Sequence, residues 1–353
     1  GEKLIVAMRV YPFVFFVSLF FCASIVNGQK VDPVAFFNED TLLELQLSGH
    51  LKQIDQPKEV GVKRPGFARM VWPDGREQKG AIEFTARGKS RLAYCDPPPL
   101  MLYFKNNNEG DLSKLGKLKL VWSCNSTDYY NQLLLREYLI YKMYNLVTPY
   151  SFRVRQVNVA FADSSRKGAV ISRRGFLLED SDDLASRQQC REYQDTMVIP
   201  EKTNIEQYTL MAMFQYMIGN TDWSISNYQN IKLLAPDTST IFRPLPVPYD
   251  FDNSGLVDAE YAVPNELIPV ENVRERFNKA MALPLGAVNA AATVLRNAQP
   301  GLMNLVDSQE GLTAGSRKYM RNYLNSFFDE MKDFEKFSKI FLNPASGAKS
   351  PKK

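Results

Sequence analysis

Residues 218–255 read IGNTDWSISNYQNIKLLAPDTSTIFRPLPVPYDFDNSG, and this stretch decides the fold that we expect for the chain. The apolar run 208–218 leads into it and ends at Gly219, as a helix commonly does. Two β-like runs, 228–234 and 241–249, follow with turn-forming residues between them. Because a hairpin brings the outer ends of its strands together, polar residues on either side of it are expected to meet.

Four polar residues flank the predicted hairpin. Asp222 and Asn227 come before it, whereas Asp250 and Asp252 follow it. An acid, an amide five residues later and a second acid beyond a β-hairpin is the order in which kinase-type enzymes place a base and their metal ligands. Each motif alone also occurs in ordinary surface turns, where Asp is favoured. Their joint placement carries the prediction of a phosphoryl-transfer site.

A calcium loop is the alternative interpretation of the same acids. Such a loop takes its oxygen ligands at positions 1, 3, 5 and 9 and a glycine at position 6. Its position 12 needs a bidentate Glu, and this sequence has Tyr261 there. On this alternative the protein binds Ca²⁺ outside the cell without turnover. The residues that fit the loop are Asp250, Asp252, Ser254, Gly255 and Asp258.

Composition narrows the possible functions. A chain of 353 residues is long enough for one large domain or for two lobes around a cleft. The formal charge is only +4, and no long Lys/Arg stripe occurs outside the C-terminal tail, so we expect no nucleic-acid partner. His50 is the single histidine in the sequence. This disfavours both a Ser-His-Asp triad and a zinc site of His and Cys.

Residues 1–28 are typical of a signal peptide region, with Met8 as the natural start. Arg9 precedes the apolar run 10–26, and small residues follow where a signal peptidase cleaves. This pattern predicts a secreted, periplasmic or cell-surface protein with no stable membrane span after cleavage. An uncleaved anchor is the alternative, because the run nears spanning length. A lipid anchor on Cys22 is disfavoured by the bulky phenylalanines before it.

Three cysteines remain after cleavage of such a signal. They are widely spaced and form no C-x-x-C motif, which disfavours a structural zinc site. In an oxidising compartment one pair is expected to form a disulfide, with one thiol left over. Cys95 with Cys124 is a candidate pair.

The chain divides into a β-rich part, residues 29–182, and a helix-rich part, residues 183–343, with a Ser/Pro/Lys-rich tail at 344–353 that is expected to be disordered. The predicted strands are 68–72, 81–86, 100–104, 118–122, 152–161 and 168–178. The predicted helices are 128–146, 205–218, 271–281, 284–296 and 316–341.

Glu137 falls inside the apolar face of the helix predicted at 128–146. A buried carboxylate is costly unless a cation pairs with it. Lys117 and Lys119 share one face of the preceding strand by the two-residue alternation of β structure, so they are the nearest candidates. A carboxylate at the edge of the apolar face that reaches water is the alternative.

Four segments together resemble the CotH kinase family, the spore-coat protein H-like atypical secreted kinases. They are residues 86–90 (ARGKS), 134–137 (LLRE), 220–227 (NTDWSISN) and 250–252 (DFD). The resemblance implies an α+β, two-lobed atypical protein-kinase-like fold, with a β-rich N-lobe, a helix C near 128–146 and a helical C-lobe that carries the catalytic and metal loops.

The resemblance also implies roles for individual residues. Asp222 would be the catalytic base, and Lys119 or Lys117 would bind phosphate and pair with Glu137. The nucleotide would lie under Arg87 and Gly88, with the segment near Glu179 facing the adenine. The metal would be held by Asn227, Asp250 and Asp252.

We therefore expect a secreted phosphotransferase that uses ATP with Mg²⁺ or Mn²⁺ and takes a protein hydroxyl as acceptor. Trp223 and Ser224 follow the proposed base where many atypical kinases carry Arg-His, and no complete glycine-rich phosphate loop is visible. These departures leave a non-catalytic protein as the alternative, either a nucleotide-binding pseudokinase or an extracellular calcium-binding or scaffold protein.

Overall fold

The structure is a computed structural model. Beyond Gly1 it describes residues 33–343 except 53, 55, 57–59, 89–90, 105–110, 196, 238–241 and 265–267. The predicted signal region with Met8 and the predicted tail at 344–353 therefore lie outside the described residues. Within the described residues, no helix is both long enough and apolar enough to cross a membrane.

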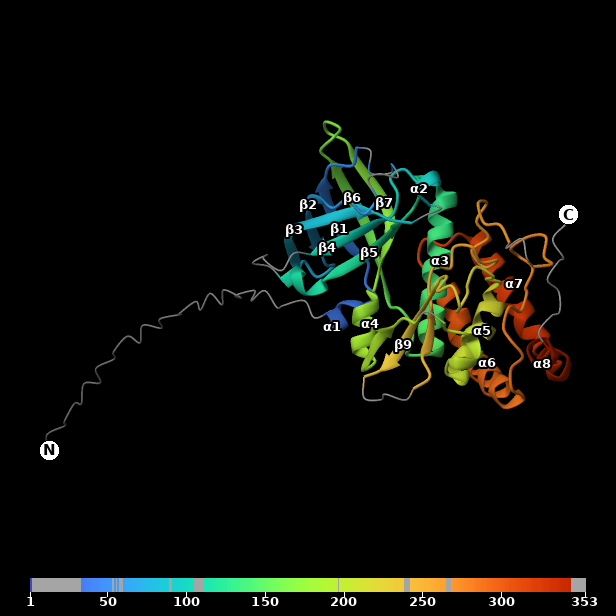
Figure 1. Cartoon of the computed structure of the whole chain (residues 1–353). Helices are drawn as coiled ribbons and strands as arrows, with labels where there is room; N and C mark the ends of the chain where they lie inside the picture. Colours follow the sequence, from blue (N-terminus) through green and yellow to red (C-terminus); the bar gives the residue numbers. More distant parts are fainter. Residues whose placement is uncertain are drawn as a thin grey trace.

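Seven strands close into a barrel that occupies one end of the molecule (Figure 1). Neighbouring strands pair antiparallel, except that β1 and β6 pair in parallel and so close the barrel. In order around the barrel the strands are β1 (Leu43–Gly49), β2 (Arg64–Val71), β3 (Glu77–Ala86), β4 (Leu100–Phe104), β5 (Lys117–Trp122), β7 (Val170–Leu178) and β6 (Val154–Asp163).

The barrel has its own apolar core, because alternate side chains of each strand point inward. In β1 the inward positions are Leu43, Leu45 and Leu47, which are almost fully buried. Phe84 and Phe161 meet edge to face inside, with ring centroids 5.5 Å apart. The short helices α1 (Pro33–Asn38), α2 (Arg91–Tyr94) and η2 (Asp111–Leu115) accompany the barrel.

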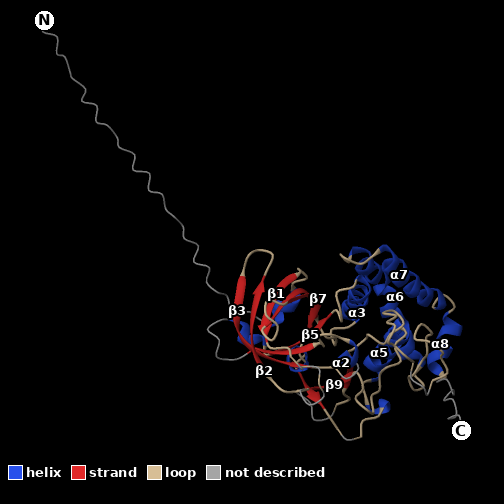
Figure 2. Cartoon of the chain, turned by 90° about the horizontal axis from the view of Figure 1, so that it is seen from above, coloured by secondary structure: helices blue, strands red, loops and turns tan. Residues whose placement is uncertain are grey.

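The remaining elements build a second core at the other end of the molecule (Figure 2). Helix α3 (Asp128–Val147) packs against β6 and β7 of the barrel and also against α6. The others are α4 (Ser181–Arg187), β8 (Cys190–Tyr193), η3 (Pro200–Lys202), α5 (Ile205–Ile218), β9 (Ile231–Pro236), β10 (Leu245–Pro248), α6 (Leu285–Ser308), α7 (Ala314–Glu330) and α8 (Phe334–Leu342).

Helix α5 leads directly into residues 219–255. The Asn204 side chain caps its start by accepting from the Gln207 amide, and it ends at Gly219 in the left-handed region with φ 67°. A Cβ at Gly219 would clash with the Tyr323 hydroxyl. Backbone conformation and close packing therefore both require glycine where the chain turns toward Asp222.

The predicted two-lobed, atypical protein-kinase-like fold with a helical C-lobe is wrong. The strands of the first half do not form an open lobe, because parallel pairing of β1 with β6 closes them into a barrel. The second half is not helical alone, since β8, β9 and β10 form an antiparallel sheet in the order β10-β9-β8. The broader expectation of a chain with both helices and strands holds.

Two helix predictions also fail. Residues 271–281 contain turns and extended backbone, and the predicted helix at 316–341 is divided into α7 and α8. The break falls before Asp333, whose side chain accepts from the Lys336 amide and caps the start of α8.

Candidate functional site

Asp222 lies in a tight loop that follows α5. The backbones of Ser224 and Gln229 exchange two hydrogen bonds of 3.0 Å each, which closes the loop. The Asp222 carboxylate accepts from the Gln229 amide and, at 3.0 Å each, from the amide groups of Asn230 and Asn253. Three amide donors therefore fix the orientation of this carboxylate, and Asn253 ties it to the segment that contains Asp250.

Lys279 holds the backbone on either side of Asp222. Its ammonium group donates to the carbonyl oxygens of Thr221 and Trp223 at 2.7 Å each. Burial lowers the pKa of Lys279, and the nearby charge of Asp222 partly opposes that shift. The cation is thus engaged by carbonyls close to Asp222 and stabilises the loop.

Asp250 has a strained backbone and a desolvated carboxyl group. Its φ is 63°, a left-handed conformation that Asp tolerates better than most residues, and its N–H donates to the Tyr141 hydroxyl at 2.8 Å. Burial raises the pKa of Asp250, and the negative charge of Asp252 raises it further. Two acids close enough to repel one another form a place where a positive charge would be stabilised.

Arg91 joins two acids that are far apart in the sequence. Its Nη2 lies 2.5 Å from Glu137 Oε2, and its Nε lies 3.0 Å from Asp252 Oδ2. All three side chains are almost fully buried. Burial nevertheless raises the pKa of Glu137 to about 7, in spite of the neighbouring guanidinium. The ion pairs connect α2, α3 and the segment after β10.

The prediction that Lys117 or Lys119 pairs with Glu137 is wrong, because Arg91 is the partner. A guanidinium presents several donors in a fixed plane, so one Arg serves two carboxylates in a way that a lysine ammonium does not. Lys117 instead lies 3.2 Å from Asp180 and 3.3 Å from Asp182.

Lys119 has no hydrogen bond or ion pair with any residue in the part of the chain that the structure describes. Its ammonium lies 4.8 Å from the centre of the Tyr249 ring and 5.9 Å from that of Phe152. Burial lowers the pKa of Lys119 to about 8, the positive charge of Arg87 lowers it as well, and Asp250 opposes both. The structure therefore holds a desolvated cation next to Asp250.

Arg87 lies at the end of β3 and reaches the same region. Its N–H bonds to the Pro99 carbonyl at 2.9 Å, and its charge acts on both Lys119 and Asp250. The next residue, Gly88, has φ 87°, which favours glycine at that position. The sequence-predicted residues Arg87, Gly88, Lys119 and Asp250 are thus in one neighbourhood.

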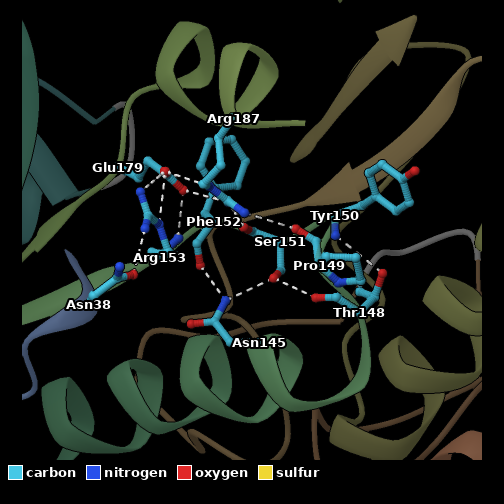
Figure 3. Close-up of polar contacts among 10 residues, drawn as sticks. All are labelled: Asn38, Asn145, Thr148, Pro149, Tyr150, Ser151, Phe152, Arg153, Glu179 and Arg187. Carbon is cyan, nitrogen blue, oxygen red and sulfur yellow. Dashed lines mark hydrogen bonds and ion pairs between the residues drawn. The ribbon is translucent and has the colours of Figure 1, made fainter. Parts of the chain in front are cut away.

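Glu179 has a structural role in this molecule. Its carboxylate is completely buried and accepts from Arg153 Nη2 at 2.8 Å and from Arg187 Nε and Nη2 at 3.0 Å each (Figure 3). The Arg153 Nε and N–H donate to it as well, at 3.0 Å each. Five donors occupy both oxygens, so this carboxylate is engaged within the protein, whereas the predicted position of the segment near Glu179 facing adenine stays a prediction.

Asn227 is exposed, and its N–H donates to the Ser224 hydroxyl at 3.4 Å. Among the described residues, its side chain has no hydrogen bond to Asp250 or Asp252. The amide side chains of Asn230 and Asn253 both donate to the Asp222 carboxylate instead. Tyr228 and Asn230 both have a left-handed backbone, and this local conformation accompanies the outward position of Asn227. Sequence spacing does not reveal such a conformation.

The acids suit a metal that is shared with a phosphate ligand. Among the described residues, no group of three or more His, Cys, Asp or Glu side chains is placed to hold a metal. Mg²⁺ is commonly bound by one or two carboxylates together with substrate phosphates and water. Asp250 and Asp252, two neighbouring acids, fit that donor set.

The side chains of the calcium-loop alternative have separate partners. Asp258 forms two bonds of 2.8 Å with Arg274, and Asp252 binds Arg91. The Ser254 hydroxyl accepts from the Val257 N–H at 3.4 Å. A calcium ion bound by the whole loop would have to break the two bonds between Asp258 and Arg274, which disfavours the calcium-loop alternative.

A disulfide joins Cys95, the residue after α2, to Cys124, which precedes α3. It confirms the candidate pair, and Cys190 is a buried free thiol. The bridge fastens the segment that carries Arg91 close to the helix that carries Glu137.

Sequence reasoning missed four residues of this site: Arg91, Asn230, Asn253 and Lys279. The need of Glu137 for a cationic partner could have indicated Arg91. The prediction was wrong because it considered only the lysines nearest in sequence. Comparison of the chain with protein-family models, with curated proteins and with solved structures gives no match.

Proposed function

We propose that this protein binds ATP together with Mg²⁺ or Mn²⁺ and transfers the γ-phosphoryl group to a hydroxyl of an acceptor protein. The observation that carries the proposal is the desolvated ammonium of Lys119, which has no partner among the described residues and lies beside Arg87 and Asp250. A partly buried cation that has no hydrogen bond or ion pair with a described carboxylate is costly to the free protein. A polyphosphate would supply the missing anion.

The chemistry requires alignment and charge neutralisation more than covalent participation by the protein. Lys119 and Arg87 would bind phosphate oxygens, which concentrates positive charge where negative charge develops. When bound, the divalent ion would neutralise phosphate charge, and Asp250 and Asp252 are the residues that would hold it.

Asp222 would act on the acceptor. Its Oδ2 accepts from Asn230 and Asn253, whereas its Oδ1 accepts from Gln229 only among the described residues. A carboxylate oxygen has two acceptor positions, so Oδ1 can take a further hydrogen bond from an acceptor hydroxyl. In that role Asp222 orients the hydroxyl and receives its proton.

The site does not depend on the kinase-like fold that the sequence predicted. Function belongs to the arrangement of side chains, and the same chemistry occurs on unrelated folds. The resemblance to CotH kinases in the four short segments supports the proposal through those residues alone. The signal-like N-terminal sequence makes a secreted or cell-surface protein the expected acceptor.

Binding is tested first by titrating ATP with Mn²⁺ into the purified full chain by calorimetry. Lys119→Met should weaken binding about 10- to 100-fold, since a hydrogen bond to a charged group contributes about 1.5–3 kcal/mol. Lys117→Met is the matched control on the same strand and should leave affinity unchanged, because Lys117 is paired with Asp180 and Asp182. Equal loss in both variants, or no binding by the wild type, would overturn the proposal.

Transfer is tested separately in Asp222→Asn, with labelled ATP and a mixture of secreted proteins as acceptors. The wild type should label acceptor protein, and the variant should bind ATP normally but lose labelling. Labelling that survives the substitution would remove Asp222 from the reaction. ATP binding without any labelling in the wild type would support the pseudokinase alternative.

A further inference from the structure

A hollow of about 650 Å³ lies beside the three-stranded sheet, apart from the ion pairs of the candidate site. Its size falls within the range of ligand-binding pockets, roughly 300–1,000 Å³. We call this surface the basic hollow. Its lining includes Arg191, Tyr193, Met197, Lys202, Phe242 and Arg243.

The basic hollow presents more cations than anions. Arg191, Lys202 and Arg243 are exposed, and none of them forms an ion pair with another described residue. Asp195 and Glu201 are the acids of the lining. The Asp195 carboxylate accepts from the Tyr193 hydroxyl at 2.9 Å. Arg191 donates to the Pro236 carbonyl at 3.3 Å and Arg243 to the Glu201 carbonyl at 2.9 Å, so no described carboxylate neutralises these charges and an anionic partner could do so.

Apolar groups accompany these cations. The rings of Tyr193 and Phe242 meet edge to face with centroids 5.1 Å apart, and the Arg191 guanidinium lies 5.4 Å from the Phe242 ring centre. Met197 is 74% exposed and the neighbouring Ile199 is 43% exposed. Exposed apolar side chains among unpaired cations suit a partner that carries both acidic and apolar side chains, as a polypeptide segment does.

The basic hollow is connected to Asp222 through one side chain. The Tyr228 hydroxyl accepts from the Asp195 N–H at 2.7 Å and donates to the Asp195 carbonyl at 3.0 Å. The residue after Tyr228 is Gln229, whose side chain donates to Asp222. A partner held in the hollow is thus positioned relative to the loop that would receive the acceptor hydroxyl.

Strand β8 separates the two regions by its alternation. Arg191 and Tyr193 line the hollow, whereas Glu192 between them points to the opposite face and lies 2.6 Å from Lys232. The charge of Lys232 in turn acts on Lys119. Substitutions in the hollow should therefore leave the Lys119 region intact.

We propose that the basic hollow docks an acidic segment of the acceptor protein that also carries an apolar side chain. The proposal rests on the phosphotransferase function proposed above, and it names the chemical class of the acceptor. Charge complementarity sets the preference for an acidic segment, and the exposed Met197 and the paired rings provide the apolar contact.

Direct binding without nucleotide tests the docking surface. The probes are two short labelled peptides, one of Glu, Asp, Leu and Phe, and one with Gln and Asn in place of the acids. Fluorescence anisotropy on the full chain should show at least about tenfold tighter binding of the acidic peptide at low ionic strength, with less preference as salt screens the charges. Equal binding of the two peptides would contradict the proposal.

A charge-reversal pair locates the site. Lys202→Glu with Arg243→Glu should weaken the acidic peptide about tenfold or more while ATP affinity stays unchanged. The matched control reverses two exposed lysines on α7 and α8, Lys318→Glu with Lys336→Glu, and should bind like the wild type. Equal weakening in the control would show a non-specific charge effect and would overturn the proposal.

Three further outcomes are decisive. Displacement of the peptide by ATP alone would show that the hollow binds small anions and is not a separate docking surface. Loss of the preference for the acidic peptide, with ATP binding intact, would contradict the docking proposal alone. Preferential binding of the acidic peptide without any ATP binding would contradict the proposed function. The basic hollow would then be a protein-binding site.

Discussion

Lys119 carries a charge that the free protein stabilises poorly. Its pKa of about 8 is below the ordinary lysine value of 10.5 because burial disfavours the ammonium. At pH 7 the ammonium is still protonated, so the full free-energy cost of burying its charge is present. Replacement by an apolar side chain of similar length should remove that cost. A residue that weakens the fold and lies beside other charges is typical of a binding site.

Lys119→Met should therefore stabilise the free protein at pH 7 while it weakens ATP binding. We expect a gain of about 1–2 kcal/mol in the free energy of unfolding, less than the full pKa shift implies because Lys119 is partly exposed. Denaturant titration measures the gain. Lys117→Met should instead be neutral or slightly destabilising, and a destabilised Lys119→Met would contradict the assignment.

The affinity for ATP should decrease as the pH rises through about 8. Only the charged ammonium attracts phosphate, and Lys119 loses its proton near that pH in the free protein. Binding above pH 8 should then take up a proton, and affinity should fall up to about tenfold per pH unit. Calorimetry in buffers of different ionisation enthalpy reports the proton. Lys119→Arg should abolish the uptake, and persistence of the uptake would exclude Lys119 as its source.

Two asparagines near the hairpin should respond differently to substitution. Asn253→Ala removes a 3.0 Å donor from Asp222, so we expect phosphoryl transfer to fall about 10- to 100-fold with little change in ATP affinity. Asn227→Ala should change transfer less than about twofold, because Asn227 is exposed and its side chain has no bond to the described acids. A larger effect at Asn227 would restore it as the metal ligand that the sequence predicted.

At the scale of elements, Arg91 holds α3 and the segment after β10 together. Arg91→Met leaves Glu137 and Asp252 buried without a cation, which should cost about 3–5 kcal/mol of stability at pH 8. The pKa of Glu137 is already raised, so stability should recover as the pH falls and the acids take up protons.

Chemical denaturation at pH 8 and pH 5 measures that recovery. Arg91→Lys is the informative control, since it keeps one charge but cannot serve both acids in the same geometry, and it should be intermediate. A loss of stability that grows toward acid pH would show that the carboxylates are not the source of the effect.

Local sequence patterns predicted most individual elements. The helix predicted at 128–146 corresponds to α3, and the one at 205–218 has the bounds of α5. The predicted strands at 100–104 and 118–122 coincide with β4 and with most of β5. Alternation and helical spacing are local signals, and they succeed where each element buries one face. The false helix at 271–281 shows the limit, because its residues pack as irregular backbone against α7, with Arg276 bonded to the Tyr323 carbonyl.

At the scale of the whole molecule, Glu179 connects the barrel to the elements that follow it. Arg153 comes from the start of β6, Arg187 from α4, and Arg153 also donates to Asn38 of α1 at 2.9 Å (Figure 3). Glu179→Gln should lower stability by about 2–4 kcal/mol, because two partly buried guanidinium groups lose their shared, fully buried anion.

Asp182→Asn is the control for that substitution. Asp182 is an acid of α4 whose side chain is 73% exposed, so its removal should cost less than about 0.5 kcal/mol. Thermal unfolding of both variants compares them. Equal effects would show that Glu179 has no special role in joining the two ends of the molecule.

The sequence did not predict how the elements of the whole chain are arranged in space. Parallel pairing of β1 with β6 joins segments that β2 to β5 separate in the sequence, and nothing local marks it. The candidate site was predicted in part for the same reason. Asp222 and Asp250 were found because a hairpin brings its ends together, whereas Arg91 meets Glu137 only after the barrel and α3 have packed.

The closure of the barrel has a consequence during synthesis. Leu43 finds its partner Val157 only when most of the barrel has left the ribosome, on the order of ten seconds later at about 5–20 residues per second. Until then one edge of β1 is open to pairing with other nascent chains. Expression pieces that stop short of Leu178, the end of β7, should aggregate, and pieces that continue past it should aggregate less.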